Sequence, residues 1–174
     1  PLYSFIIMVI KSIFENFNSI VVLQTLCVGF GIINFTKVAT NHLNLDLLTK
    51  TLTALFLFLP LIQFYKNILT EPFSYGFSLL FVSFVLRLIF NFNLLNLFWS
   101  SFFAIAMLLM RNQFIFLYPV MLILYLGIFS LNNSKKTFIL LTFSFISIFI
   151  VHNSLISLNK YVKKDYFDQN NLFK

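Results

Sequence analysis

The sequence LLNLFWSSFFAIAMLLMRNQFIFLYPVMLILYLGIFSL, residues 94–131, contains two apolar runs that are separated only by Arg111, Asn112 and Gln113. Neither run holds a charged residue, and each is close to the ~20 residues that an α-helix needs to cross the hydrocarbon core of a bilayer. A charge at mid-bilayer costs about 2.5–3.5 kcal/mol, so the arginine marks the end of a span. This stretch predicts two membrane-crossing helices joined by a tight turn.

The rest of the chain has the same character. Of its 174 residues, 60% are apolar, 20% are aromatic and only 10% are charged, and the mean hydropathy is +0.93. A soluble domain carries about 25% charged residues because it must cover its core with a water-compatible surface. These values exclude a disordered chain, a collagen-like fibre, a disulfide scaffold and a cytosolic enzyme. They indicate a polytopic membrane protein.

Charge and cysteine content bound the partners. The net charge is +7, but the basic residues are scattered singly between apolar runs, which does not suggest nucleic acid. Anionic lipid head groups or a phosphorylated lipid suit such charges better. The single cysteine, Cys27, lies inside an apolar run, so the chain forms no internal disulfide.

Charge-free intervals predict an all-α transmembrane bundle with six spans in residues 20–158. Residues 1–16 are predicted as an interfacial helix, because the apolar Leu2–Phe14 is too short to span. Lys37–Lys50 is predicted as a loop and residues 159–174 as a polar tail. The runs lack the alternation of barrel strands. The predicted spans are Ile20–Phe35, Thr51–Tyr65, Phe73–Leu86, Leu94–Met110, Phe114–Leu131 and Thr137–Leu158.

Six spans place both chain ends on one side of the membrane. The positive-inside rule slightly favours cytoplasmic ends, because seven Lys and Arg residues fall on the side of the ends and five on the other. The seven are Lys11, Lys66, Arg111, Lys160, Lys163, Lys164 and Lys174, and the five are Lys37, Lys50, Arg87, Lys135 and Lys136.

Motifs of soluble enzymes are absent. The chain has no Gly-rich phosphate loop, no paired histidines at metal-binding spacing, no Cys cluster and no nucleophile elbow. His42 and His152 are far apart and lack acidic neighbours, so both are interpreted as polar residues near a membrane boundary.

Glu71 differs from the other four carboxylates, because it lies between two closely spaced spans. Pro72 suits the first position of a helix, which puts Glu71 just before the N-terminus, where the helix dipole favours an acid. Two interpretations stay open: an acid that caps the helix, or an acid that faces an active site at the membrane surface. Arg111 has the same ambiguity, as a turn residue whose side chain snorkels or as a guanidinium that binds a phosphate. In the six-span arrangement Glu71, Arg111 and Lys66 emerge on one face, which suits an anionic lipid-linked substrate.

The order of segments supports the second interpretation. PLYS (1–4) is followed by VVLQTL (21–26), LFLPLIQFYKNILTEPFSYGFSLLF (57–81) and FAIAMLLMRNQFIFLYPVMLIL (103–124). This order resembles the dolichyl-phosphate-mannose-protein mannosyltransferase-like family of integral membrane glycosyltransferases, which have the GT-C fold. The Pro-Tyr stretch of the family corresponds to Pro1-Leu2-Tyr3, and its acid after Ser or Thr at the start of a span corresponds to Thr70-Glu71-Pro72. Its Ala-rich helix that ends in a basic residue corresponds to Ala104-Ile105-Ala106 running to Arg111, and the early proline of the next helix corresponds to Pro119.

The resemblance implies transfer of a sugar from a polyprenyl-phosphate-linked donor to a protein, lipid or glycan acceptor on the outer side of the cell (inner) membrane. It implies that Arg111 and Lys66 bind the lipid phosphate, that Glu71 is an active-site acid, and that no metal is needed. The family's catalytic acid precedes the Pro-Tyr stretch, so it is expected upstream of Pro1, and the chain alone is expected to be inactive. The family orientation puts Glu71 and Arg111 outside the cytoplasm, against the slight charge preference.

Three alternatives remain open. A transporter or permease usually carries ionisable residues inside broken helices, whereas here such residues cluster at the span ends. A polymerase or ligase of surface polysaccharide usually has a large extracytoplasmic loop, which this chain lacks. Nothing in the sequence excludes a non-catalytic assembly subunit.

Overall fold

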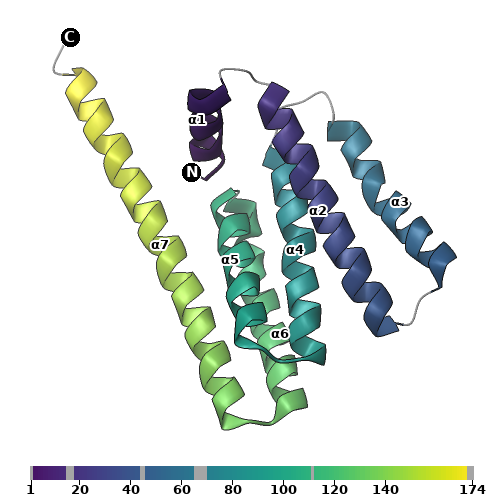
Figure 1. The fold of residues 1–174 in the computed structure, drawn as a ribbon. Helices are drawn as coiled ribbons and strands as arrows, with labels where there is room; N and C mark the ends of the chain where they lie inside the picture. Colours follow the sequence, from purple (N-terminus) through teal and green to yellow (C-terminus); the bar gives the residue numbers. More distant parts are fainter. Residues whose placement is uncertain (1, 15–17, 44–45, 65–69, 111, 172–174) are drawn as a thin grey trace.

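The computed structural model describes residues 2–14, 18–43, 46–64, 70–110 and 112–171. These residues form seven α-helices and one short 3₁₀ helix, and no strand occurs among them (Figure 1). The predicted all-α class is therefore confirmed. The elements are α1 (Leu2–Phe14), α2 (Asn18–Leu43), α3 (Leu47–Phe64), α4 (Thr70–Phe90), α5 (Leu94–Met110), η1 (Asn112–Phe116), α6 (Leu117–Asn132) and α7 (Lys135–Asn171).

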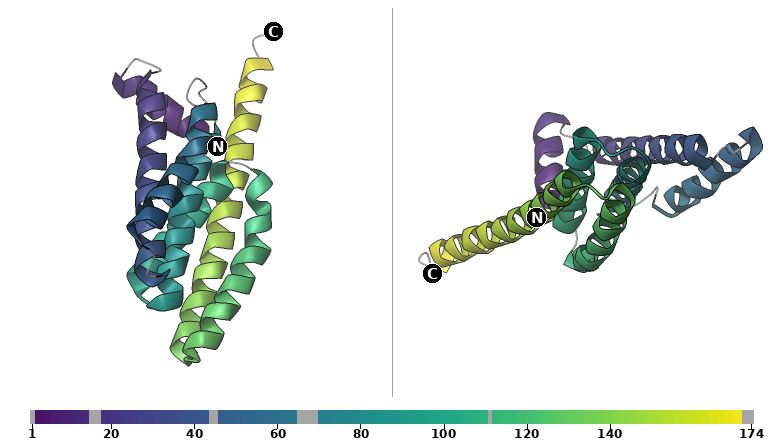
Figure 2. Two further views of the ribbon diagram at one scale, coloured as in Figure 1. Left: turned by 90° about the vertical axis from the view of Figure 1, so that its right-hand side faces the viewer. Right: turned by 90° about the horizontal axis from the view of Figure 1, so that it is seen from below.

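Helices α2 to α7 alternate in direction, so the chain connections gather at two ends of the bundle (Figures 1 and 2). We call one end the turn end, because the α2–α3, α4–α5 and α6–α7 connections lie there. We call the other end the Glu71 end, because α4 begins there. Helix α1 lies at the Glu71 end, while α3 and α7 flank the bundle on opposite sides (Figure 1).

Four helical segments are long and apolar enough to cross a membrane: Asn18–His42, Glu71–Phe90, Phe114–Asn132 and Lys135–Asn159. The apolar segments Leu47–Pro60 and Leu94–Met110 are shorter. Many large apolar side chains of these helices are exposed, which suits a surface that faces lipid. Each of the six predicted spans overlaps one of the helices α2 to α7, with Phe114–Phe116 in η1 and Tyr65 outside the described residues. The number of spans stays a prediction.

Two predicted boundaries at the turn end are wrong. Helix α2 continues to Leu43, through half of the predicted loop Lys37–Lys50, and α3 already begins at Leu47. Lys37 is exposed, whereas the next three residues are buried against the bundle. A lysine on the outer face of a helix keeps its charge in water and does not end the helix.

Two further predicted helix ends, at Arg87 and at Leu158, also lie inside helices. Arg87 was expected to close a span, but α4 continues to Phe90. The Arg87 guanidinium donates a hydrogen bond to the Asn34 side chain (3.1 Å) and lies 4.9 Å from the centre of the Phe84 ring. Helix α7 continues to Asn171, so most of the predicted polar tail 159–174 is helical.

The closest helix contact joins α2 and α4, which are not neighbours in the sequence. A Cβ atom added to Gly31 would lie 2.8 Å from the backbone oxygen of Gly76, and one added to Gly76 would lie 2.8 Å from the Cys27 sulfur. Small residues let two helix backbones approach closely in a membrane, where packing rather than the hydrophobic effect drives association. These two glycines hold α4 in place between α2 and α5.

Candidate functional site

Glu71 lies within the first turn of α4, which begins one residue earlier, at Thr70. The sequence pattern predicts Glu71 just before the helix, so the predicted boundary is corrected by about one residue. Pro72 is fully buried in the same turn, where a missing N–H group costs no hydrogen bond. The Glu71 side chain is half-buried, close to the positive end of the helix dipole.

Four elements meet beside Glu71. Ile10 of α1, Ile20 of α2, Phe73 of α4 and Met110 of α5 form one buried apolar cluster, which we call the Glu71-end cluster. Phe73 follows Glu71 by two residues, and Met110 immediately precedes Arg111 in the chain. The two chain segments that carry the predicted acid and the predicted phosphate-binding arginine are thus brought together.

Two of the predicted site residues lie outside the described residues. These are Lys66, in the connection before α4, and Arg111, between α5 and η1. Of the predicted set, Glu71 alone has a described position.

The two histidines have different surroundings. His42 is exposed near the end of α2, and its ring stacks on that of Phe90 with the centroids 3.9 Å apart. His152 is only 5% exposed, and its Nδ1 atom is 2.6 Å from the Tyr118 hydroxyl. His152 lies seven residues before the end of the apolar segment Lys135–Asn159, so its interpretation as a polar residue near a membrane boundary stays a prediction.

The Tyr118–His152 pair was missed by sequence reasoning. The Nε2 atom of His152 is buried and has no hydrogen-bond partner among the described residues. The one signal in the sequence is a histidine within a charge-free apolar run. Its partner lies in another helix, so spacing along the chain could not identify the pair.

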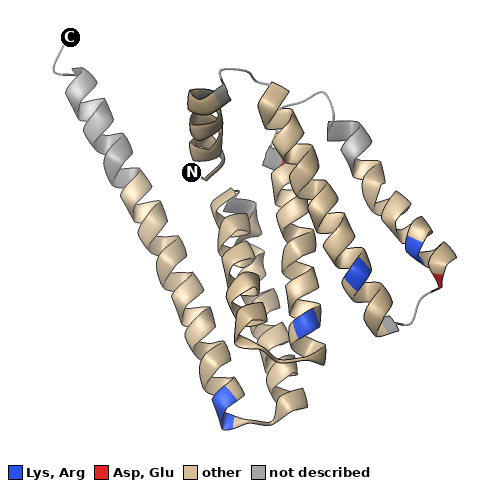
Figure 3. Ribbon diagram, in the orientation of Figure 1, with Lys and Arg blue, Asp and Glu red and all other residues tan. Residues whose placement is uncertain are grey.

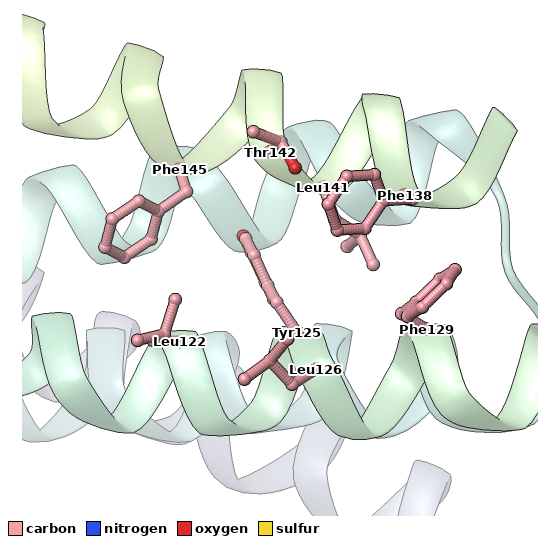
Figure 4. Close-up of a pocket in the computed structure, with 8 residues that line it drawn as sticks. All are labelled: Leu122, Tyr125, Leu126, Phe129, Phe138, Leu141, Thr142 and Phe145. Carbon is pink, nitrogen blue, oxygen red and sulfur yellow. The ribbon is translucent and has the colours of Figure 1, made fainter. Parts of the chain in front are cut away.

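A second polar group lies deeper in the bundle. The Ser144 hydroxyl is 2.6 Å from the Ser101 hydroxyl and 3.1 Å from that of Tyr125, which joins α5, α6 and α7. Tyr125 also lines an apolar groove of about 230 Å³ between α6 and α7 (Figure 4). Phe129, Phe138 and Phe145 form much of the wall, and no charged residue lines the groove. Its chemistry suits a hydrocarbon chain.

The described side chains contain no group of three or more His, Cys, Asp or Glu residues that could hold a metal ion. Comparisons with protein-family models, with curated proteins and with solved structures find no significant match to this chain.

Proposed function

We propose that this protein is a membrane glycosyltransferase that transfers a sugar from a polyprenyl-phosphate-linked donor to an acceptor on the extracytoplasmic side. In this proposal the helices α2 to α7 form six spans in the cell membrane. Arg111 and Lys66 bind the lipid phosphate, and Glu71 orients the acceptor or a cationic partner.

The observation that carries the proposal is that Phe73 and Met110 belong to the same buried Glu71-end cluster. This cluster joins the start of α4 to the end of α5, which is the arrangement that a shared acid and phosphate site requires. A turn-anchoring arginine and an isolated capping acid have no need for such proximity.

The proposed roles follow from the charges that develop in the reaction. The departing lipid phosphate gains negative charge, and preorganised cations lower the free energy of that transition state. A guanidinium can donate two parallel hydrogen bonds to a phosphate, which fixes its orientation as well as its charge. Deprotonation of the acceptor hydroxyl requires a base, and we assign that role to no residue of this sequence.

The turn end supports six crossings rather than four. Asn91, in the α4–α5 turn, and Ser134, in the α6–α7 turn, line one pocket. The two turns therefore lie on the same side, which requires α5 and α6 each to cross the bundle. Helix α5 has 17 residues, and at 1.5 Å per residue it is about 25 Å long, within the range that local thinning of a bilayer accommodates.

The experiment measures binding of a polyprenyl phosphate to the purified protein in phosphatidylcholine nanodiscs. We expect Arg111→Ala to weaken binding by roughly 10- to 150-fold, because a hydrogen bond to a charged group contributes about 1.5–3 kcal/mol. Arg111→Lys keeps the charge but loses the planar fork, so it should recover only part of this loss.

Lys50→Ala is the matched control, since it removes one positive charge at the turn end, where α3 begins. We expect it to leave binding of the polyprenyl phosphate unchanged. Wild-type affinity in Arg111→Ala would return Arg111 to the role of a turn anchor and would remove the basis of the proposal.

One observation favours a second function, a transporter or permease. The titratable side chain of His152 contacts Tyr118, and both residues lie in helical segments that are apolar enough to cross a membrane. Titratable groups within a membrane often mark proton pathways. If the protein is a transporter, sealed vesicles that contain it should take up substrate, and His152→Gln should abolish this uptake. Binding of a polyprenyl phosphate should then be unchanged in Arg111→Ala.

A further inference from the structure

A polar pocket of about 330 Å³ lies at the turn end, away from Glu71. The α4–α5 turn supplies Asn91 and Asn93 to its wall, and the start of α7 supplies Ser134, Lys136 and Thr137. These residues are remote in sequence, and the antiparallel arrangement of the helices brings them together.

The polar groups of this pocket are mainly hydrogen-bond donors. Lys136 supplies an ammonium group, and no Asp or Glu lines the pocket. The Oδ1 atom of Asn93 accepts a hydrogen bond from the backbone N–H of Leu95 (3.1 Å), so its amide NH₂ is the group that remains to donate. A positive charge without a neighbouring carboxylate suits an anion and opposes a metal cation.

Thr137 is the most informative residue of the pocket. Thr25 and Thr51 donate their hydroxyl hydrogens to the carbonyls four residues earlier, those of Val21 and Leu47. Thr137 is only 6% exposed, and within the described part of the chain its hydroxyl makes no such bond. Thr137 as a residue is largely buried, and a hydroxyl on the pocket wall without such a bond is available to a ligand.

The N-terminus of α7 adds a positive electrostatic potential to that of the Lys136 ammonium group. The first N–H groups of a helix have no acceptor within it, and here the hydrogen bond nearest to the start runs from the Phe138 N–H to the Ser134 carbonyl. The N-terminus also carries the positive end of the helix dipole. Backbone N–H groups and this dipole together favour a phosphate or another anion.

The wider surroundings are also positive. The Lys and Arg residues whose side chains the structure describes all lie toward the turn end, whereas Asp46 is the one described acid there (Figure 3). Positive side chains attract an anion over distances up to the Debye length, which is about 10 Å at 0.1 M salt. The residues are Lys37, Lys50, Arg87, Lys135 and Lys136.

From these observations we infer that the pocket between the α4–α5 turn and the start of α7 binds a phosphate group. The Lys136 ammonium and the Thr137 hydroxyl contact its oxygens, and the asparagine amides complete the set of donors. The phosphate belongs either to the head group of an anionic phospholipid or to a soluble phosphate compound. This site is independent of the proposed glycosyltransferase site, which lies at the other end of the helices.

The test uses the purified chain in phosphatidylcholine nanodiscs, with binding measured by thermophoresis. One arm adds short-chain phosphatidylglycerol, and the other adds glycerol 3-phosphate. We expect Lys136→Gln to weaken binding by roughly 10- to 150-fold, because it removes a charged hydrogen-bond donor. Binding in the first arm alone identifies a lipid head group, and binding in the second alone identifies a soluble compound.

Lys135→Gln is the matched control, since both lysines are exposed and carry the same charge, but Lys135 does not line the pocket. It should weaken binding by less than about fivefold, because without a direct contact it acts only through an attraction that solvent and salt screen. Thr137→Val should weaken binding by about two- to tenfold without lowering the melting temperature, because the hydroxyl has no partner to lose. Equal effects of Lys135→Gln and Lys136→Gln, or no binding of either probe, would overturn the inference.

Discussion

At the scale of single residues, the four glycines of this chain have different tasks. Gly31 and Gly76 lie where two helix backbones touch, whereas an added Cβ at Gly29 would have no neighbour within 4 Å. All three are helical, so conformational freedom does not distinguish them. They differ in the room for a Cβ atom, and this difference gives a direct test of the α2–α4 contact.

We expect Gly31→Ala to lower the free energy of unfolding by about 1–3 kcal/mol, because the new methyl group must push two backbones apart. Gly29→Ala should leave it unchanged or raise it by up to about 1 kcal/mol, since alanine is the better helix former. The measurement is reversible unfolding in mixed micelles, followed by the fluorescence of Trp99, which contacts the rings of Phe84 and Phe103. Equal stability of the two variants would contradict a close α2–α4 contact.

At the scale of elements, short polar contacts determine where helices begin and how they are joined. Asp46 precedes α3, and its carboxylate accepts a hydrogen bond from the Thr49 backbone N–H (3.3 Å). Hydrogen bonds from Thr49, with its side chain first, lower the pKa of Asp46 below the ordinary value for an aspartate. Such a cap satisfies one of the N–H groups that the first helical turn leaves without a partner.

The lowered pKa has a defined consequence for pH dependence. A carboxyl group with a lower pKa in the folded state stabilises that state above its unfolded pKa, and the contribution is lost as the pH falls through the folded value. We therefore expect the first turn of α3 to fray as the pH falls below about 4. The Thr49 amide chemical shift should report this change by NMR. Asp46→Asn keeps an acceptor, so it should hold the turn ordered at low pH.

The Tyr118–His152 hydrogen bond is one of the polar contacts between α6 and α7. Tyr118→Phe should lower the free energy of unfolding by about 0.5–2 kcal/mol, the range for hydrogen bonds between helices in a membrane. The double variant Tyr118→Phe, His152→Leu should cost less than the sum of the two single changes, because replacing both partners leaves no polar atom unpaired. Additive costs in this double-mutant cycle would show that the two side chains are not coupled.

At the scale of the whole molecule, the alternation of α2 to α7 is the feature with the largest consequence. If all six helices cross the membrane, the α4–α5 and α6–α7 turns share one side. If the two shorter apolar helices do not cross, these turns lie on opposite sides. The number of spans can therefore be read from two positions.

We expect cysteines introduced at Asn91 and Asn133, with Cys27 replaced, to be labelled by an impermeant reagent from the same side of the membrane, and that side to be the cytoplasm. A cysteine at Asn67 should be labelled from the opposite side. Labelling of the positions 91 and 133 from opposite sides would contradict six spans. Labelling of both from outside the cell would reverse the proposed orientation.

The sequence predicted the helices well because a charge-free apolar run has few alternatives in a membrane. It predicted their ends less well, because Lys37 and Arg87 lie on helices whose other faces are buried. It did not predict which helices pack together, since the glycines at 31 and 76 give no signal of being partners. Of the site, the helix-terminal position of Glu71 was predicted to within a residue, while the Tyr118–His152 contact was not predicted because the two residues lie on different helices.

The α2–α4 contact also has a consequence for biosynthesis. Ribosomes add roughly 5–20 residues per second, so Gly31 is made several seconds before Gly76, and α3 is made between them. During this interval the glycine face of α2 has no partner and is covered by lipid or by the insertion machinery. The core of this bundle therefore closes only after α4 has been inserted, and a stalled or truncated nascent chain that ends within α3 presents an open helix face to quality-control proteases.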